Sequence, residues 1–268
     1  MKEKIVVITG ASSGIGKALA IEFGKLGANI VLAARNKNAL VSIVADINSL
    51  GGNAICVATD VRDEYQCKNL IDKTIEKYNK IDILINNAGI SMRALFEDVD
   101  LSVIHELMNT NFWGTVYCTK YALPYLISSK GSLVGVSSIA GYQGLPGRTG
   151  YSASKFAMHG FLETIRIENI KNNLHVLIAC PGFTASNIRN TALNKDGKQQ
   201  GESPRDESKM MSPEDVAKNI IKAIKNRKNT LILTMQGKLT VFLKKFFPSL
   251  INKLVYKHME EEKDSPMK

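Results

Sequence analysis

Residues 4–16 read KIVVITGASSGIG, and this stretch decides the fold. It opens with four consecutive β-branched apolar residues, which are typical of a strand buried on both faces. Apolar residues at helical spacing follow from Lys17 to Gly27 and predict a helix. The glycines between the two elements allow the backbone to approach a phosphate, which the helix N-terminus attracts. We therefore expect a bound nucleotide, with a tight turn that holds no ligand as the alternative.

The alternation of strand and helix continues along the chain. Apolar runs predict further strands at residues 28–34, 54–58, 81–85, 131–136, 174–179 and 230–233. Segments with helical spacing lie between them at residues 38–50, 63–78, 101–127 and 151–171, and a last helix begins at Ser212. Pro124 predicts a kink or a junction in the longest helix. This order predicts an α/β fold of the Rossmann type, a doubly wound parallel sheet with helices on both faces.

Charged residues follow the second and third predicted strands, where this fold holds the adenosine part of a dinucleotide. Arg35 stands where an acid often binds the ribose 2′-hydroxyl, and a guanidinium there suits the 2′-phosphate of NADP. The alternative is a solvated surface arginine. Asp60 fits two roles equally well, contact with the adenine amino group or the cap of the next helix.

Residues 137–155 contain the candidate catalytic side chains. Tyr151 and Lys155 are four residues apart, so a helix places both on one face. A phenol titrates near pH ~10, and a nearby cation lowers its pKa toward useful proton transfer. Ser138 lies across a glycine-rich turn and can hydrogen-bond the same reacting oxygen. A tyrosine and a lysine at this spacing also occur on many helices by chance, so the pair alone is weak evidence.

Two asparagines have a structural and a functional interpretation each. Asn87 follows the fourth strand, directly before Ala88 and Gly89, which leave room for a flat ligand. Asn87 either lines that ligand or only bridges neighbouring strands. Asn111 lies in a largely apolar helix, where a polar amide needs a partner. It is either a buried structural residue or the anchor of a water molecule near the site.

Taken together, these residues resemble the short-chain dehydrogenase/reductase family over residues 4–233. The resemblance depends on the order of the motifs: Thr9-Gly10-x3-Gly14-x-Gly16, Asn86-Asn87-Ala88-Gly89, Asn111, Ser138, Tyr151-x3-Lys155 and Pro181-Gly182. Such an ordered set is much more specific than any one of its members. It implies an NADP(H)-dependent enzyme that interconverts a carbonyl and a secondary alcohol by hydride transfer.

The resemblance also implies a role for each matching residue. Tyr151 is the expected general acid or base, Ser138 orients the substrate oxygen, and Asn111 anchors a water linked to Lys155. Lys155 is expected to hold the nicotinamide ribose and to lower the pKa of Tyr151. The other implied cofactor contacts are Gly10, Ser12, Ser13, Gly14, Ile15 and Gly16 around the phosphates and adenosine ribose, Arg35 at the 2′-phosphate, Asp60 and Val61 at adenine, Asn87, Ala88 and Gly89 at the cofactor ribose, and Thr184 at the carboxamide.

The remainder of the chain bears on the substrate. Residues 187–211 are polar and lack periodicity, which predicts either a lid, over about residues 183–211 within a single domain of residues 1–236, or a disordered segment. The predicted pocket is lined by this lid, by residues 139–145, and by Ile90, Met92, Leu95 and Phe96. Several of these are apolar, which favours a lipophilic substrate such as a steroid, retinoid or long-chain ketone. A ketoacyl-type reductase is the alternative, although such relatives end soon after the last strand.

Residues 237–268 form a basic extension with two apolar stripes separated by Pro248. The first stripe is Leu239, Phe242, Leu243 and Phe246, and the second is Leu250, Ile251, Leu254 and Val255. Basic amphipathic helices bind anionic membranes, which predicts a peripheral membrane contact. A subunit interface and a packed C-terminal cap are the alternatives.

Composition limits the remaining functions. The net charge is +10, but no nucleic-acid-binding motif accompanies the basic residues, so we expect no nucleic acid partner. Scattered cysteines and histidines predict no metal site and a reducing, cytoplasmic location, and no apolar run approaches the ~20 residues that span a bilayer. The resemblance implies a homodimer or homotetramer. A non-catalytic NADP(H)-binding regulator is the competing class, which the complete set of candidate catalytic residues argues against.

Overall fold

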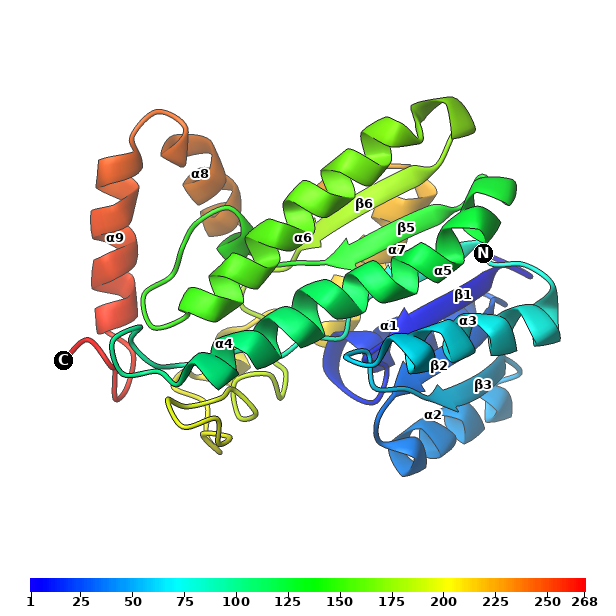
Figure 1. Cartoon of the computed structure of the whole chain (residues 1–268), viewed down its shortest axis with the longest axis horizontal. Coiled ribbons are helices and arrows are strands. Elements are labelled where there is room, and N and C mark those ends of the chain that lie inside the picture. The colour runs from blue at the N-terminus through cyan, green and yellow to red at the C-terminus, as the bar shows by residue number, and fades with distance from the viewer.

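The computed structural model describes residues 1–268, apart from the side chain of Lys209. Within the described chain, seven parallel strands form one sheet in the order β3-β2-β1-β4-β5-β6-β7. Their bounds are β1 Ile5–Thr9, β2 Asn29–Ala34, β3 Asn53–Ala58, β4 Ile83–Asn86, β5 Ser132–Val136, β6 His175–Cys180 and β7 Thr230–Ile232. Helices cover both faces (Figure 1), which confirms the predicted α/β doubly wound sheet.

Each face of the sheet has its own apolar core. One core packs beneath α1 (Gly14–Lys25), α2 (Lys37–Ser49) and α7 (Pro213–Lys225). The other packs beneath α3 (Glu64–Tyr78), α5 (Gly114–Ser128) and α6 (Thr149–Glu168). Successive side chains of β1 alternate between the two, because Val6 and Ile8 enter the first core and Val7 the second. Both faces of the strands are therefore buried, as their β-branched sequences predict.

The strand order reverses between β1 and β4, which opens a crevice at the carboxyl ends of the strands. At the opposite edge, the buried Asp82 accepts hydrogen bonds from the Ile5 amide (2.9 Å) and the Lys4 ammonium (2.7 Å). Burial opposes the charged form, but these bonds and Lys80 hold the pKa of Asp82 below its usual range. Asp82 thus fixes the beginnings of the two strands that flank the crevice.

The long helix predicted over residues 101–127 is interrupted, but at a different place from the one expected. The structure has α4 (Leu101–Leu107), a π-helix (Met108–Trp113) and then α5, which continues through Pro124 to Ser128. The junction predicted at Pro124 is therefore wrong, and the break lies in the π-helix that contains Asn111. Single π-turns within helices often mark functional sites. Short 3₁₀ turns occur at Ile139–Gly141, Ile170–Asn172 and Glu207–Lys209.

The C-terminal segment forms α8 (Met235–Lys244) and α9 (Pro248–Glu260). Figure 1 shows both helices beyond the carboxyl ends of the strands, with residues 183–211 running below them. The domain boundary predicted after residue 236 falls inside α8. No helix of the described residues is both long and apolar enough to cross a membrane.

Candidate active site

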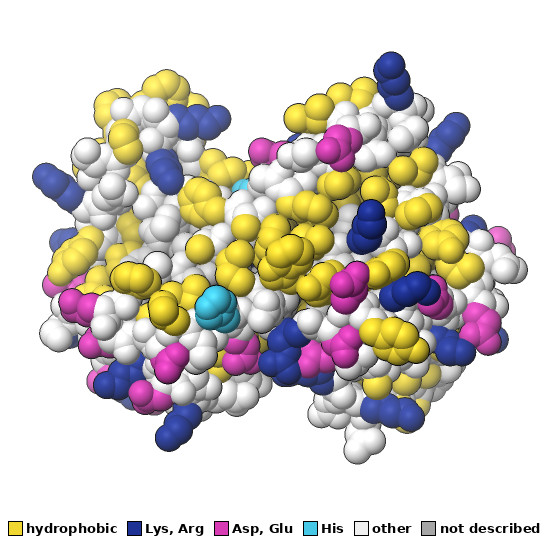
Figure 2. Space-filling view, viewed as in Figure 1, with side chains coloured by type: hydrophobic (Ala, Val, Ile, Leu, Met, Phe, Trp, Pro, Cys, Tyr) yellow, Lys and Arg dark blue, Asp and Glu magenta, His cyan; other side chains and the backbone are white. Residues whose placement is uncertain are grey.

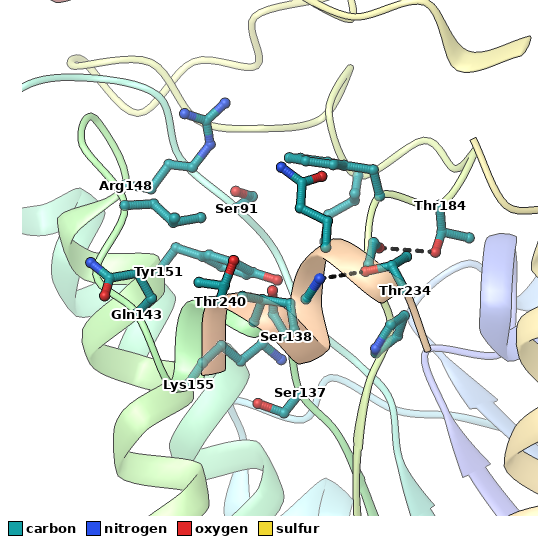
Figure 3. A pocket seen from close by; sticks show the side chains of 18 of the residues that line it. Ser91, Ser137, Ser138, Gln143, Arg148, Tyr151, Lys155, Thr184, Thr234 and Thr240 are labelled. Atoms are coloured by element: carbon teal, nitrogen blue, oxygen red, sulfur yellow. Dashed lines mark hydrogen bonds between the residues drawn. The ribbon is translucent and has the colours of Figure 1, made fainter. Parts of the chain in front are cut away.

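A cavity of about 900 Å³ lies at the carboxyl edge of the sheet, where the crevice meets α8 and α9. Ser138 lines it two residues after the end of β5, and Tyr151 and Lys155 line it from the first turns of α6. In Figure 3, Tyr151 and Ser138 lie together at the centre of the cavity, and Lys155 lies below them. The structure therefore brings together three of the four predicted catalytic side chains.

Tyr151 and Ser138 lie side by side at the centre of the cavity. Burial raises the pKa of the Tyr151 phenol, and the hydrogen bond from Ser138 opposes that shift. The Ser138 hydroxyl oxygen also accepts from the Ala140 amide at 3.1 Å, which fixes its orientation in the turn. The sequence predicted a pKa lowered by Lys155, but the Lys155 ammonium lies 5.8 Å from the centroid of the ring and burial outweighs other effects on the phenol. Ser138 favours the phenolate most, and the charges of Arg148 and Arg189 act in the same direction.

Lys155 is almost completely buried, and its ammonium donates to the Val136 carbonyl at 3.0 Å. Burial lowers the pKa of Lys155 to about 8, because a charged ammonium loses hydration there. Behind it, the Ser137 hydroxyl lies 2.7 Å from His159 Nε2. Burial and the nearby Lys155 lower the pKa of His159 to about 4, so this imidazole is neutral at pH 7.

Asn111 is completely buried, and both the nitrogen and the oxygen of its side-chain amide form hydrogen bonds within the protein. Its nitrogen donates to the Ile90 carbonyl (3.0 Å) and the Ser154 hydroxyl (2.9 Å), and its oxygen accepts from the Ile90 amide (2.8 Å). These bonds give Asn111 the structural role that the sequence left open. Both Asn111 and the Lys155 ammonium lie beside Gly89, within 3.5 Å of the position a Cβ would take there. The role of Asn111 as the anchor of a water remains a prediction.

The glycine-rich turn fits a dinucleotide phosphate. Gly10 and Gly14 have φ of +64° and +51°, and a Cβ on Gly16 would lie 2.2 Å from the Gly10 carbonyl oxygen. Only glycine is compatible with this backbone. The Ser13 side chain makes no capping hydrogen bond in the described structure, so the first amides of α1 can meet an anion. Ile15 lines the cavity beside this turn.

Asn87 joins the turn to the end of β4. Its side chain donates to the carbonyls of Thr9 (3.0 Å) and Gly10 (3.1 Å), and the Thr9 hydroxyl accepts from the amides of Asn87 and Ala88. Asn87 thus bridges neighbouring strands, which was one of its two interpretations. It also lines the cavity together with Gly89, and its contact with a ligand stays a prediction.

Three predicted contacts lie away from this cavity, at the ends of β2 and β3. Arg35 is exposed and close enough to Asp60 to contribute to lowering its pKa, although burial opposes that shift and Arg62 contributes more. Asp60 pairs with Arg62 at 2.6 Å, and the cap of α3 is Asp63, which accepts from the Gln66 amide. The capping interpretation of Asp60 is therefore wrong. Val61 is buried against Gly114, and its carbonyl accepts from the Cys67 thiol at 3.4 Å, so its contact with adenine stays a prediction.

The substrate end of the cavity differs from the one predicted. Of the segment that follows Gly89, Ser91 lines the cavity, whereas Met92 is buried in a small core and Phe96 is exposed. Thr184 lines the cavity as predicted, with its hydroxyl bonded to the Gly182 carbonyl at 3.1 Å. The sequence did not predict that residues of α8 and α9 also line it: Gln236, Gly237, Leu239, Thr240, Leu243, Ile251, Leu254, Val255, His258 and Met259. The apolar stripes of the extension were the signal: they were interpreted as a membrane contact, with a subunit interface or a packed C-terminal cap as the alternatives, and none of these placed them in the substrate cavity.

Arg148 is another functional residue that the sequence analysis missed. It precedes α6, lines the cavity, and extends toward its far end from Tyr151 (Figure 3). Its guanidinium bonds Glu262, which lies 114 residues away in the chain. No local pattern could reveal this contact, because it depends on where the C-terminal tail folds back.

Comparison with known proteins gives the same family as the motifs. A family model described as short chain dehydrogenase matches residues 4–197. A Dictyostelium discoideum protein, dehydrogenase/reductase SDR family protein 7-like, is 36% identical over 96% of this chain and 82% of its own length. An Arabidopsis thaliana protein, 11-beta-hydroxysteroid dehydrogenase 1A, is 41% identical over 69% of this chain. The match spans 53%, about half, of that relative's length.

Solved structures agree with the fold. A short chain dehydrogenase/reductase from Burkholderia phymatum in complex with NAD aligns with a TM-score of 0.84 and 25% identity, over 93% of this chain and 95% of its own. An alcohol dehydrogenase from the archaeon Thermococcus sibiricus, complexed with 5-hydroxy-NADP, has a TM-score of 0.78 at 23% identity, over 87% and 96% of the two chains. With the ordered motifs and the matched relatives, these findings show that the chain belongs to the short-chain dehydrogenase/reductase family.

Proposed function

We propose that this oxidoreductase uses NADP(H) to interconvert a carbonyl and a secondary alcohol on a lipophilic substrate. The observation that carries the proposal is the position of Tyr151, Ser138 and Lys155 in the middle of one large cavity. The glycine turn and Asn87 border the cavity on one side, and apolar side chains of α8 and α9 border it on the other. The site thus has room for a dinucleotide and a substrate that meet at the phenol.

The side chains divide the proton chemistry between them. When bound, the nicotinamide would accept or supply the hydride. In the reducing direction, Tyr151 donates its proton to the carbonyl oxygen, while the Ser138 hydroxyl hydrogen-bonds that oxygen. Lys155 lies below the phenol and would hold the nicotinamide ribose. The phenolate left after transfer is favoured by the Ser138 hydroxyl and by the positive charges of Arg148 and Arg189. In the oxidising direction, Tyr151 takes the proton back from the alcohol.

The cavity lining supports a lipophilic substrate. The walls beyond Tyr151 contain Leu145, Phe183, Ile188, Met210, Leu239, Leu243, Ile251, Leu254 and Val255. Burial of apolar ligand surface against such walls contributes roughly 25 cal/mol per Å². Relatives named as 11-beta-hydroxysteroid dehydrogenases are consistent with a steroid-like ketone or alcohol.

Arg35 supports NADP(H) over NAD(H). It is exposed directly after β2, where the adenosine ribose lies in this fold. A guanidinium there forms charge-assisted hydrogen bonds with a 2′-phosphate but gains nothing from a 2′-hydroxyl. Its neighbour Asp60 is already paired with Arg62, so its carboxylate is not reserved for the ribose.

A fluorescence titration with NADPH and NADH tests the nucleotide assignment. Wild-type protein should bind NADPH at least about tenfold more tightly, and Arg35→Ala should lose that preference while NADH binding changes little. The exposed Lys73, on the distant α3, provides the control Lys73→Ala. Failure to bind either nucleotide contradicts the whole proposal, and an Arg35→Ala variant that still prefers NADPH contradicts the NADP assignment.

The reaction is then tested with the preferred nucleotide. NADPH absorbance is followed with an 11-keto steroid, a retinoid aldehyde, 2-dodecanone and a β-ketoacyl thioester. Turnover of the lipophilic ketones supports the proposal. Turnover of the thioester alone favours the ketoacyl alternative, and binding without turnover of any carbonyl favours a regulator.

We also propose a peripheral membrane contact through α8 and α9. Large apolar side chains on these helices and on the turn between them are at least half exposed: Met235, Leu239, Phe242, Phe246, Phe247, Leu250 and Leu254. The exposed Lys238, Lys245, Lys253 and Lys257 lie on the same helices and complement anionic lipid. Leu239 and Leu254 also line the cavity, so this surface borders its mouth. Figure 2 shows yellow and dark blue side chains together at this upper left end of the molecule.

Vesicle co-sedimentation tests this contact. Vesicles that contain phosphatidylserine should retain the protein at low salt, and Phe242→Ser/Phe246→Ser should weaken retention. Neutral phosphatidylcholine vesicles are the comparison for the charge contribution. Equal recovery in the supernatant with and without anionic vesicles contradicts the membrane proposal.

We also propose that the protein forms a homodimer or homotetramer, and that its subunits contact each other through the face that carries α4, α5 and α6. Leu101, Trp113 and Phe156 are exposed there, and Figure 2 shows hydrophobic side chains gathered across the centre of this face. Light scattering should give a dimer or tetramer for the wild type and a smaller particle for Trp113→Glu/Phe156→Glu. A monomeric wild-type protein contradicts this assignment.

A further inference from the structure

The C-terminal tail buries one carboxylate among arginines from three other segments. Glu262 accepts hydrogen bonds from Arg205 at 2.7 Å and Arg148 at 2.8 Å, and Arg93 Nε lies 3.7 Å from it. Arg93 follows β4, Arg148 precedes α6, and Arg205 belongs to residues 183–211. Segments that are far apart in the sequence therefore converge on a single side chain at the end of the chain.

Two of the three arginines also line the cavity, and the third holds the tail. Arg148 lines the cavity three residues before Tyr151, and its backbone carbonyl accepts from the Ser152 amide in the first turn of α6. The Arg205 guanidinium stacks 4.0 Å from the ring centroid of Phe183, and both residues line the cavity. The Arg93 guanidinium donates to the Lys263 carbonyl in the tail. A change at Glu262 is therefore transmitted to the substrate end of the site.

The charges of this cluster explain why the carboxylate matters. Burial opposes its ionisation, but Arg148 and Arg205 hold the pKa of Glu262 below its usual range, so it is charged at pH 7. Without that charge, like-charged guanidiniums face one another in a buried place, where screening by water is weak. The expected response is separation of the tail, residues 183–211 and the turn before α6.

We propose that Glu262 is a positioning residue that closes the substrate end of the cavity by holding the lid and the turn before α6 against the C-terminal tail. Its recorded partners all lie on this side of the site, away from the glycine turn that faces the nucleotide. Glu262 therefore acts on substrate binding and leaves nucleotide binding unchanged. The kinetic part of its test depends on the proposed function, whereas the structural part does not.

Glu262→Gln tests the inference because it removes the charge and keeps the shape. Its matched control is Glu261→Gln, which removes the same charge from the exposed neighbour. Amide hydrogen exchange is measured on the full chain with NADPH present and absent. Glu262→Gln should accelerate exchange in residues 183–211 and 259–268 by about tenfold, because their local opening becomes easier. Exchange in β1 and α1 should not change, and Glu261→Gln should match the wild type throughout.

Kinetics on whichever ketone the wild type reduces give the second measurement. Glu262→Gln should raise KM by about tenfold with kcat within about twofold, the pattern of lost uniform binding, and Glu262→Asp should recover part of the loss. Unchanged exchange and unchanged KM overturn the inference. A rise in KM that is accompanied by an equally large fall in kcat and in NADPH affinity also overturns the inference, since it indicates general destabilisation.

Two further outcomes separate the inference from other failures. If the wild type reduces no ketone, the proposed function fails while the exchange measurement still decides the role of Glu262. If Glu262→Gln does not fold, Arg205→Gln replaces it, because this change removes the charged contact between the lid and Glu262 and keeps the Arg148–Glu262 pair. Faster exchange confined to residues 183–211 and 259–268 supports the inference in that variant, and wild-type exchange overturns it.

Discussion

Two groups of buried positive charge face the same cavity. One group is paired with a carboxylate, and the other is not. At the substrate end, Arg148 and Arg205 share the carboxylate of Glu262. At the centre, Lys155 donates to the Val136 carbonyl, and no carboxylate among the described residues is recorded as acting on it. Burial lowers the pKa of Lys155 to about 8. Burial also lowers the pKa of Arg148, but the neighbouring Glu262 opposes that shift.

This difference separates a structural role for the arginines at Glu262 from a functional role for Lys155. A buried ion pair is satisfied within the protein, so removing one partner leaves an uncompensated charge. A buried cation without a neighbouring acid lowers the stability of the folded protein. Unpaired cations of this kind concentrate at functional sites. We therefore expect the arginine cluster to stabilise the fold and Lys155 to destabilise it while serving the chemistry. Three substitutions test this contrast.

The largest effect is expected at the phenol beside Lys155. Tyr151→Phe should lower kcat/KM by about 10²–10⁴-fold, because it removes the proton donor while the ring still fills its place. The Kd for NADPH should stay within about twofold, since Tyr151 acts on the reacting oxygen. Steady-state kinetics and nucleotide titration measure the two quantities. Near-normal turnover in this variant would exclude Tyr151 as the acid and leave the centre of the cavity without a role.

The next largest effect is expected at the substrate end. Arg148→Met should reduce the free energy of unfolding by about 2–4 kcal/mol, because Glu262 loses one of its two closest buried partners. Urea denaturation measures this loss. Lys263→Met is the matched control, because Lys263 is the exposed neighbour of Glu262 and its change should leave stability as it is. Stability equal to that of the wild type in Arg148→Met would mean that the cluster contributes nothing to the fold.

The contrast also explains how much of this molecule could be predicted from the sequence. The cofactor half follows local rules: β-branched runs form buried strands, and glycines such as Gly16 mark a backbone that no side chain tolerates. Ser138, Tyr151 and Lys155 lie close to these elements, so their spacing was sufficient to place them together. The predicted sheet is accordingly correct, although the helical break at Met108–Trp113 was placed at Pro124.

The substrate half could not be predicted in the same way. Glu262 reaches Arg148 across 114 residues, and no period or motif links them. The apolar stripes of α8 and α9 were visible, but a stripe does not say what it covers. Leu239 and Leu254 turn out both to line the cavity and to be half exposed, a combination that depends on tertiary packing.

The smallest effect is expected from removing the unpaired cation, and its sign is opposite to that of Arg148→Met. Lys155→Met should raise the free energy of unfolding at pH 7 by about 1–3 kcal/mol, because the wild type buries an ammonium that the unfolded chain hydrates. The folded pKa of about 8 lies below the ordinary value of 10.5, so the unfolded wild type binds more protons between these two values. Wild-type stability therefore rises with pH in that window, and the advantage of the variant should shrink between pH 8 and pH 10. Urea denaturation of both proteins at pH 7, 8 and 9.5 measures this convergence. A stability gap that stays constant across these pH values would show that Lys155 keeps its charge in both states, and the contrast with the arginine cluster would then rest on geometry alone.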